Sequence, residues 1–270
     1  MTHSSLLGKR ILVTHADAFM GPVLCEVLAR HGATVIPNTE TLREPEAPAD
    51  LVAAVGDVDI LVANLAIRNP RTPVTDVDEA EWREVFAALV DPLPRLCRAV
   101  LPAMIARRSG KILLMGSASA LRGIKGATTY SAARGAQLAY VQSLGVEVAA
   151  HNVQVNAIAQ NFVDNPTYFP PEVQSDPRFQ DRLKREVPLG RLVSANEDAE
   201  FAAYLCSDAA SCFVGQVFAV CGGWVQRWRR ACCSQTLCRV SLDRSLRGLC
   251  SRCVRITCFE FVGGDVNANG

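Results

Sequence analysis

Short apolar runs alternate with helical patterns along the first 225 residues, and this alternation restricts the chain to few folds. The apolar runs have the length of buried strands, and the segments between them have the period of amphipathic helices. We predict strands at 10–16, 33–38, 60–64, 111–119, 153–161 and 215–224. We predict helices at 21–32, at 78–108 with a bend or break near Pro92 and Pro94, at 130–152 and within 185–210.

Strands that are apolar throughout and that alternate with helices form βαβ units. The sheet is then parallel, and helices cover both of its faces. The sequence therefore predicts an α/β fold with a doubly wound parallel sheet. A ligand of such a fold binds at the carboxyl ends of the strands.

Composition excludes several classes of protein. Hydrophobic residues make up 49% of the chain, which is enough for a sizeable core. The net charge of +1 argues against a general binder of nucleic acids or of anionic membranes. The chain has no apolar run of membrane-spanning length, and its first ten residues lack the apolar centre of a signal peptide. We expect a cytoplasmic protein.

The last 44 residues, 227–270, differ in composition from the rest and predict an appended extension that need not be ordered. Six of the 11 cysteines fall there: Cys232, Cys233, Cys238, Cys250, Cys253 and Cys258. A zinc site around Cys250 and Cys253 is an open alternative, although the segment has a single CxxC pair and no histidine. Our prediction is a protein of two parts, a catalytic domain at 1–226 and this extension, without a metal.

Three polar residues near the fourth predicted strand carry the candidate chemistry. Ser117 ends that strand, Tyr130 opens the next helix, and Arg134 lies one helical turn beyond Tyr130. Residues four apart share a helix face, and a nearby guanidinium stabilises a phenolate. The trio suits general acid–base catalysis at an alcohol or epoxide oxygen. Without further context, a Tyr–Arg pair at this spacing is more often a surface pair, and Ser119 is the alternative serine.

Several motifs, in order, resemble the short-chain dehydrogenase/reductase superfamily over residues 8–225. The segment GSASALRGIKGATTYSAAR resembles the superfamily's Ser and Tyr-x-x-x-Lys, and VQVNAIA and SDAASCFVGQVFAVCGGW resemble its later strands. This resemblance implies a Rossmann-like fold. It also makes the Ser117–Tyr130–Arg134 trio an active site rather than a surface feature.

The chain departs from that superfamily where a dinucleotide would bind. The loop THADAFMG has His15 and Phe19 in place of two glycines, and a phenylalanine blocks the approach of a pyrophosphate to the backbone. Asn38 stands where an acidic residue would hold the adenosine ribose, and Arg134 replaces the lysine that grips the nicotinamide ribose. The pattern predicts a site that retained its acid–base group and gave up its cofactor.

That combination is similar to the halohydrin dehalogenases, a cofactor-independent branch of the superfamily. The resemblance implies conversion of vicinal haloalcohols to epoxides with release of halide, and the reverse opening of epoxides by azide, cyanide or nitrite. Ser117, Tyr130 and Arg134 would be catalytic. The halide and substrate would be bound by Phe19, Gln160, Asn161, Phe162, Val163, Tyr168 and Phe169. No cofactor is expected.

Two rival functions remain at this point. The first is an NAD(P)-dependent reductase, which would retain Ser117 and Tyr130 but would need the loop that Phe19 alters. The second is a binding or regulatory protein without activity on the same scaffold. The resemblance also implies a homotetramer, because helices 78–108 and 130–152 match those that pack between subunits in the superfamily.

Overall fold

The computed structural model describes residues 6–226, and its centre is a six-stranded sheet. All strands are parallel, in the order β2-β1-β3-β4-β5-β6. Their bounds are β1 Arg10–Val13, β2 Thr34–Pro37, β3 Ile60–Ala63, β4 Gly110–Ser117, β5 Val153–Gln160 and β6 Val217–Val220. The predicted doubly wound parallel sheet is confirmed.

Alternate residues of each strand enter different cores. Leu12 packs with the helices on one face of the sheet, whereas its neighbours Ile11 and Val13 pack with the helices on the other. Side chains of successive strand residues point to opposite faces, so a strand that is buried on both sides must be apolar throughout. The near-continuous apolar runs in the sequence follow from this two-sided burial.

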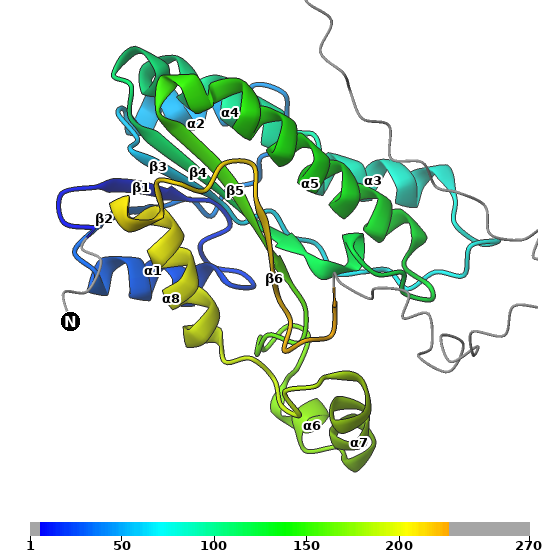
Figure 1. Ribbon diagram of the computed structural model, residues 1–270. Coiled ribbons are helices and arrows are strands. Elements are labelled where there is room, and N and C mark those ends of the chain that lie inside the picture. The colour runs from blue at the N-terminus through cyan, green and yellow to red at the C-terminus, as the bar shows by residue number, and fades with distance from the viewer. Residues whose placement is uncertain (1–5, 227–270) are drawn as a thin grey trace, which may run out of the picture. The chain divides into compact units, whose positions relative to one another are not determined.

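The helices form two layers (Figure 1). Helices α1 (Gly21–Arg30) and α8 (Ala195–Cys206) pack together on one face. Helices α2 (Ala47–Val55), α4 (Pro92–Ala106) and α5 (Thr128–Val148) cover the other, with α3 (Glu79–Leu89) against α4 and α5. Short 3₁₀ turns lie at Ala118–Ala120, Ala149–His151 and Asp208–Ala210.

The helix predicted at 78–108 is two helices, α3 and α4, and the break falls just before Pro92. A proline fits the first turn of a helix because it lacks the N–H that would be unpaired there. Pro92 therefore begins α4 rather than bending a longer helix. This corrects the single-helix form of the prediction and agrees with the break expected near Pro92.

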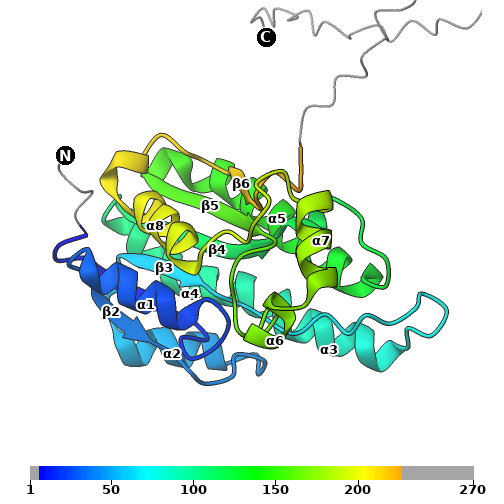
Figure 2. The ribbon, with the colours of Figure 1, turned by 90° about the horizontal axis from the view of Figure 1, so that it is seen from below.

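Two short helices after β5 were missed by the sequence analysis. These are α6 (Pro171–Gln174) and α7 (Pro177–Glu186), which lie together apart from the two helix layers (Figures 1 and 2). The sequence does contain a signal for the start of α7, namely Asp176 followed by Pro177, since Asp is a preferred N-cap residue and Pro a preferred first helical residue. In the structure the Asp176 side chain accepts a hydrogen bond from the Arg178 amide, as an N-cap does. Helix α7 supplies residues to the pocket described below.

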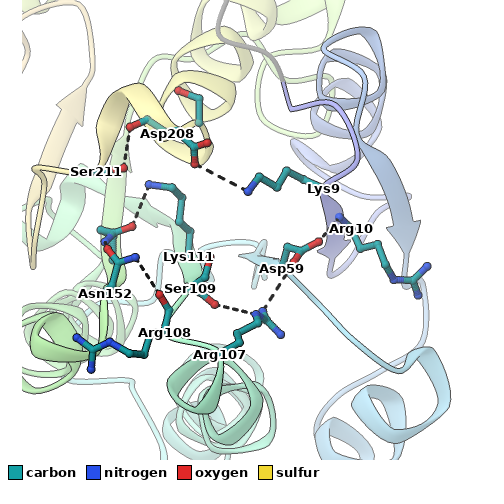
Figure 3. A network of polar contacts seen from close by, with 12 residues as sticks. Lys9, Arg10, Asp59, Arg107, Arg108, Ser109, Lys111, Asn152, Asp208 and Ser211 are labelled. Carbon is teal, nitrogen blue, oxygen red and sulfur yellow. Dashed lines mark hydrogen bonds and ion pairs between the residues drawn. The ribbon is translucent and has the colours of Figure 1, made fainter.

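A polar network ties together the amino ends of the strands (Figure 3). Lys9 pairs with Asp208 at 3.9 Å, and the buried Lys111 ammonium donates to Gln154 Oε1 at 3.1 Å. Burial lowers the pKa of Lys111. The strand ends opposite to this network carry the pocket, so the network anchors the sheet away from the site.

The predicted extension at 227–270 and its six cysteines lie outside the described residues. Within 6–226, no cluster of three or more His, Cys, Asp or Glu side chains is arranged to hold a metal ion. The same part of the chain contains no helix that is both long and apolar enough to cross a membrane.

Candidate active site

One pocket of about 520 Å³ lies at the carboxyl ends of the strands. Its walls come from the segments that follow β1, β3, β4 and β5, from the first turns of α5, and from α7. All ten residues predicted for the site line it: Phe19, Ser117, Tyr130, Arg134, Gln160, Asn161, Phe162, Val163, Tyr168 and Phe169. The carboxyl ends of neighbouring parallel strands share one edge of the sheet, which brings these distant segments together.

In the loop after β1, two residues that are not glycine adopt the left-handed backbone conformation that glycine usually adopts. His15 has φ 44° and Phe19 has φ 53°. A bulky residue in this region costs on the order of 1–2 kcal/mol, and such strain is concentrated at functional positions. Gly21 closes the loop, because a Cβ there would lie 2.2 Å from the His15 carbonyl oxygen. The loop therefore keeps its shape and carries an aromatic ring at position 19.

Asn64, which directly follows β3, holds this loop in place. Its side-chain amide donates to the carbonyl oxygens of His15 at 3.0 Å and Ala18 at 3.1 Å. In return, His15 Nδ1 lies 3.0 Å from the Asn64 carbonyl oxygen. The Phe19 ring lies 5.7 Å from the Tyr168 ring, centroid to centroid. Position 19 thus presents a ring to the pocket where bare backbone would be needed to contact a pyrophosphate.

Ser117 and Ser119 form a hydroxyl pair at the end of β4. Their Oγ atoms are 2.9 Å apart, and the Ser119 amide donates to Ser117 Oγ at 3.2 Å. Both residues line the pocket. The geometry therefore joins the two serines that the sequence presented as alternatives, with Ser117 receiving the backbone hydrogen bond.

Tyr130 and Arg134 are buried side by side on α5, 7% and 4% exposed. The guanidinium carbon of Arg134 lies 5.1 Å from the centroid of the Tyr130 ring. Arg134 Nη1 donates to the Leu65 carbonyl oxygen at 2.9 Å and to Gln137 Oε1 at 3.0 Å. Among the described residues no carboxylate pairs with this guanidinium, and its buried Nε has no partner. Arg134 is thus fixed beside the Tyr130 ring by hydrogen bonds to neutral acceptors.

Tyr168 is a hydrogen-bond donor at this site rather than a base. Its hydroxyl donates to the Ile67 carbonyl oxygen at 2.9 Å. Burial, followed by the neighbouring Tyr130, raises the pKa of Tyr168 well above its ordinary value. Tyr168 therefore keeps its proton at neutral pH. Tyr168 lines the pocket, and its hydrogen bond to Ile67 ties the segment after β5 to the segment after β3.

The segment after β5 forms a turn with aromatic and aliphatic walls. Phe162 has φ 52°, and its amide donates to the Asn161 side chain at 2.9 Å. Val163 pairs with Val193 in an isolated bridge that fixes the far side of the turn. The ring of Phe169 lies 6.1 Å from that of Phe162. The turn thus combines peptide dipoles with apolar surface.

Asp198 supports the start of this turn and was not predicted. It is fully buried on α8, and its Oδ2 accepts a hydrogen bond from the side-chain amide of Gln160. Burial raises the pKa of Asp198 to about 7, and the hydrogen bond from Gln160 offsets part of that rise. The available signal was an acidic residue on the face of α8 that buries Ala202 and Leu205.

Arg122 and Arg182 at the pocket wall were also missed, and Trp224 was not among the residues predicted for this site. Trp224 is 6% exposed, and its ring meets Phe162 edge-on at 6.0 Å. Arg122 and Arg182 line the pocket as well. Nothing in the local pattern of the sequence singles out these residues, because they come from segments that meet only in the folded chain.

The chain belongs to the short-chain dehydrogenase/reductase superfamily. Residues 23–225 match the family described as enoyl-(acyl carrier protein) reductase. The chain is 31% identical to the 3-oxoacyl-[acyl-carrier-protein] reductase of Escherichia coli K12 over 241 residues, which cover 80% of this chain and 97% of the relative.

Among solved structures, the chain is similar to a protein described as a dehalogenation enzyme, with 30% identity and a TM-score of 0.75. It is similar to a halohydrin dehalogenase bound to ethyl (2S)-oxiran-2-ylacetate, with 30% identity and a TM-score of 0.74. Each likeness covers 82% of this chain and 99% of the other. The relatives thus include both reductases and dehalogenases, and the specific activity must be argued from the site.

Proposed function

We propose that this protein is a halohydrin dehalogenase, which converts a vicinal haloalcohol to an epoxide with release of a halide ion and a proton. The observation that carries the proposal is Phe19. It holds a glycine-like backbone, yet it places a ring at the pocket beside Tyr168. Tyr130 and Arg134 lie side by side at the pocket, whereas the loop after β1 carries the Phe19 ring where the superfamily has a glycine.

Tyr130 is the general base in this mechanism. Its deprotonated oxygen takes the proton of the substrate hydroxyl, while Ser117 donates a hydrogen bond to the same oxygen. The resulting alkoxide attacks the neighbouring carbon and forms the C–O bond of the epoxide as the carbon–halogen bond breaks. The halide leaves with the bonding electrons, and Tyr130 passes its proton to solvent. In reverse, Tyr130 protonates the epoxide oxygen while azide, cyanide or nitrite attacks carbon.

The turn at 160–163 is the proposed halide site. A halide is weakly hydrated, so peptide dipoles with apolar walls suit it better than a tightly paired charge. Phe162 and Phe169 supply apolar surface, and the left-handed backbone at Phe162 turns the chain at this point. Holding oxygen, carbon and halide in line supplies much of the remaining acceleration.

The second candidate is an NAD(P)-dependent reductase. The curated relatives favour it by name, including the Escherichia coli reductase and a 2-keto-3-deoxy-L-fuconate dehydrogenase of Xanthomonas campestris that is 32% identical. Ser117 and Tyr130 would serve a reductase equally well. Against it stand Phe19 and the hydrogen bonds that tie Arg134 to the Leu65 carbonyl and to Gln137.

The deciding experiment measures halide release from 1,3-dibromo-2-propanol without added cofactor. We expect turnover by the parent and a fall of roughly 10²–10⁴-fold in Tyr130→Phe, the range for loss of a general base. The matched control is Tyr204→Phe, which removes a half-exposed hydroxyl outside the pocket and should behave like the parent.

Two results would count against the proposal. Micromolar binding of NADPH with no halide release would support the reductase. Absence of both, with Tyr130→Phe equal to the parent, would support a protein without activity.

We also propose a homotetramer that packs through α4 and α5. These helices carry a shallow apolar groove with a charged rim, lined by Arg98, Leu101, Pro102, Ile105, Tyr140, Ser143, Leu144 and Glu147. Val146, also on α5, is 72% exposed. Burial of this surface against a second copy would remove apolar area from water. Sedimentation velocity measures the assembly directly, and a monomer at micromolar concentration would contradict this proposal.

A further inference from the structure

Basic residues outnumber acidic residues in the lining of the pocket, whereas acidic residues outnumber basic residues in the described part of the chain as a whole. Residues 6–226 contain 20 Arg and Lys against 24 Asp and Glu. The pocket is lined by five basic residues, Arg71, Arg122, Lys125, Arg134 and Arg182, and by one acidic residue, Glu186. An excess of one sign in a cleft raises the local concentration of ligands of the opposite sign.

Two of these guanidinium groups are held on aromatic rings that touch each other. The guanidinium carbon of Arg122 lies 4.6 Å from the Trp224 ring centroid, and that of Arg182 lies 5.4 Å from the Phe162 ring centroid. The two rings meet edge-on at 6.0 Å. Arg122 is fixed further by donating from Nη1 to the Trp224 carbonyl oxygen at 2.7 Å. The aromatic pair therefore positions two cations on one wall of the pocket.

Of these two guanidinium groups, Arg182 has a carboxylate partner that it shares, and Arg122 has none in the described part of the chain. Arg182 Nε lies 3.1 Å from Glu186, but the same carboxylate also pairs with Arg185 at 3.0 Å. Within residues 6–226, no carboxylate pairs with Arg122. Like charges on one wall repel each other unless an anion lies between them. Planar guanidinium groups match the two oxygens of a carboxylate.

The pocket also has room for more than the reacting atoms. Its volume of about 520 Å³ lies in the range that fits drug-sized ligands, roughly 300–1,000 Å³. A three-carbon haloalcohol bound at Tyr130 would fill only part of this volume, and Arg122 and Arg182 line the same pocket. A substituent on the substrate can fill that space.

We propose that the substrate is a haloalcohol or epoxide that carries a carboxylate, and that Arg122 and Arg182 bind this carboxylate. The identity of the reacting group rests on the proposed function. The binding of the carboxylate does not, because it depends only on the two guanidinium groups and the pocket. Arg122 and Arg182 are thus the residues that determine specificity, while Tyr130 acts at the other end of the substrate.

The test separates binding from turnover by using two unreactive ligands of nearly equal shape. Calorimetry measures the dissociation constants of 3-hydroxybutyrate and of its amide, 3-hydroxybutyramide, with the full chain. We expect the parent to bind the acid at least tenfold more tightly than the amide. The dissociation constant of the amide divided by that of the acid should therefore be at least ten in the parent. This ratio should approach one in Arg122→Gln, and it should be smaller than the parental ratio in Arg182→Gln.

Arg83→Gln is the matched control, because it removes the same charge from an exposed position on α3 outside the pocket. It should keep the parental ratio. Equal binding of acid and amide by the parent would overturn the inference, as would an equal loss of preference in Arg83→Gln.

Halide release from 4-chloro-3-hydroxybutyrate and from its amide is measured in parallel. If neither releases halide but the acid still binds more tightly through Arg122, the carboxylate site stands and the proposed reaction fails. If both release halide and kcat/KM for the amide equals or exceeds that for the acid, the reaction stands and the carboxylate inference fails.

Discussion

Replacement of Asp198 by Asn tests the buried carboxyl group that supports the start of the turn at 160–163. Asp198 is fully buried, its Oδ1 has no partner within the described residues, and Gln160 is the donor to its Oδ2. Burial raises the pKa of this carboxyl group from the ordinary 3.8 to about 7 in the folded protein. Ionisation is therefore easier in the unfolded chain than in the native one.

The sign and size of the effect on stability follow from this pKa difference. Between pH 4 and 7 the native state binds a proton that the unfolded state has lost, so stability falls as the pH rises. With pKa values of 3.8 and about 7, ionisation of this group lowers the free energy of unfolding by roughly 2–3 kcal/mol more at pH 8 than at pH 5. Asn keeps an acceptor for the Gln160 amide and cannot ionise.

The assay is urea denaturation of the parent and of Asp198→Asn at pH 5 and pH 8. All other titrating groups are common to both proteins, so they cancel in the difference between the two free energies of unfolding. We expect the advantage of the variant to be larger at pH 8 than at pH 5 by about 2–3 kcal/mol. A difference that stays constant between the two pH values, or that grows toward acid, would refute the reasoning.

Two further substitutions test the loop at the pocket and the packing of α5. Phe19→Gly keeps the positive φ without strain but removes the ring. We expect KM for the haloalcohol, measured by steady-state halide release, to rise at least tenfold, and an unchanged KM would show that the ring does not contact the substrate. Gly145→Ala places a Cβ 2.5 Å from the Gly215 amide nitrogen and should cost roughly 1–3 kcal/mol in urea denaturation, whereas Gly135→Ala on the same helix meets nothing within 4 Å and should be neutral or stabilising.

The parallel sheet and the positions of most elements were predictable from the sequence. A strand buried on both faces must be apolar throughout, and β3, with its four buried residues, shows this directly. The trio Ser117, Tyr130 and Arg134 was also predictable as a group, because a strand end and the first turns of the following helix lie close together in a βαβ unit.

Other features of the site depend on contacts between distant segments. Asp198 meets Gln160 across 38 residues, and Arg122 reaches Trp224 across 102 residues. Neither pair leaves a periodic signal in the sequence, because no local pattern records which loops meet. The left-handed backbone at Phe19 is likewise decided by the hydrogen bonds that Asn64 makes to the loop.

By itself the sequence determined the layered sheet and the edge that carries the pocket, and it singled out Ser117, Tyr130 and Arg134 as candidate acid–base residues. These depend on burial and on spacing along the chain, which are local properties. Tertiary structure decided the buried state of Asp198 and the left-handed turns at Phe19 and Phe162. It also decided the placement of Arg122 and Arg182 on the aromatic rings of the pocket wall. Those features arise only when segments far apart in sequence are brought into contact, since burial and charge pairing depend on every neighbour in space.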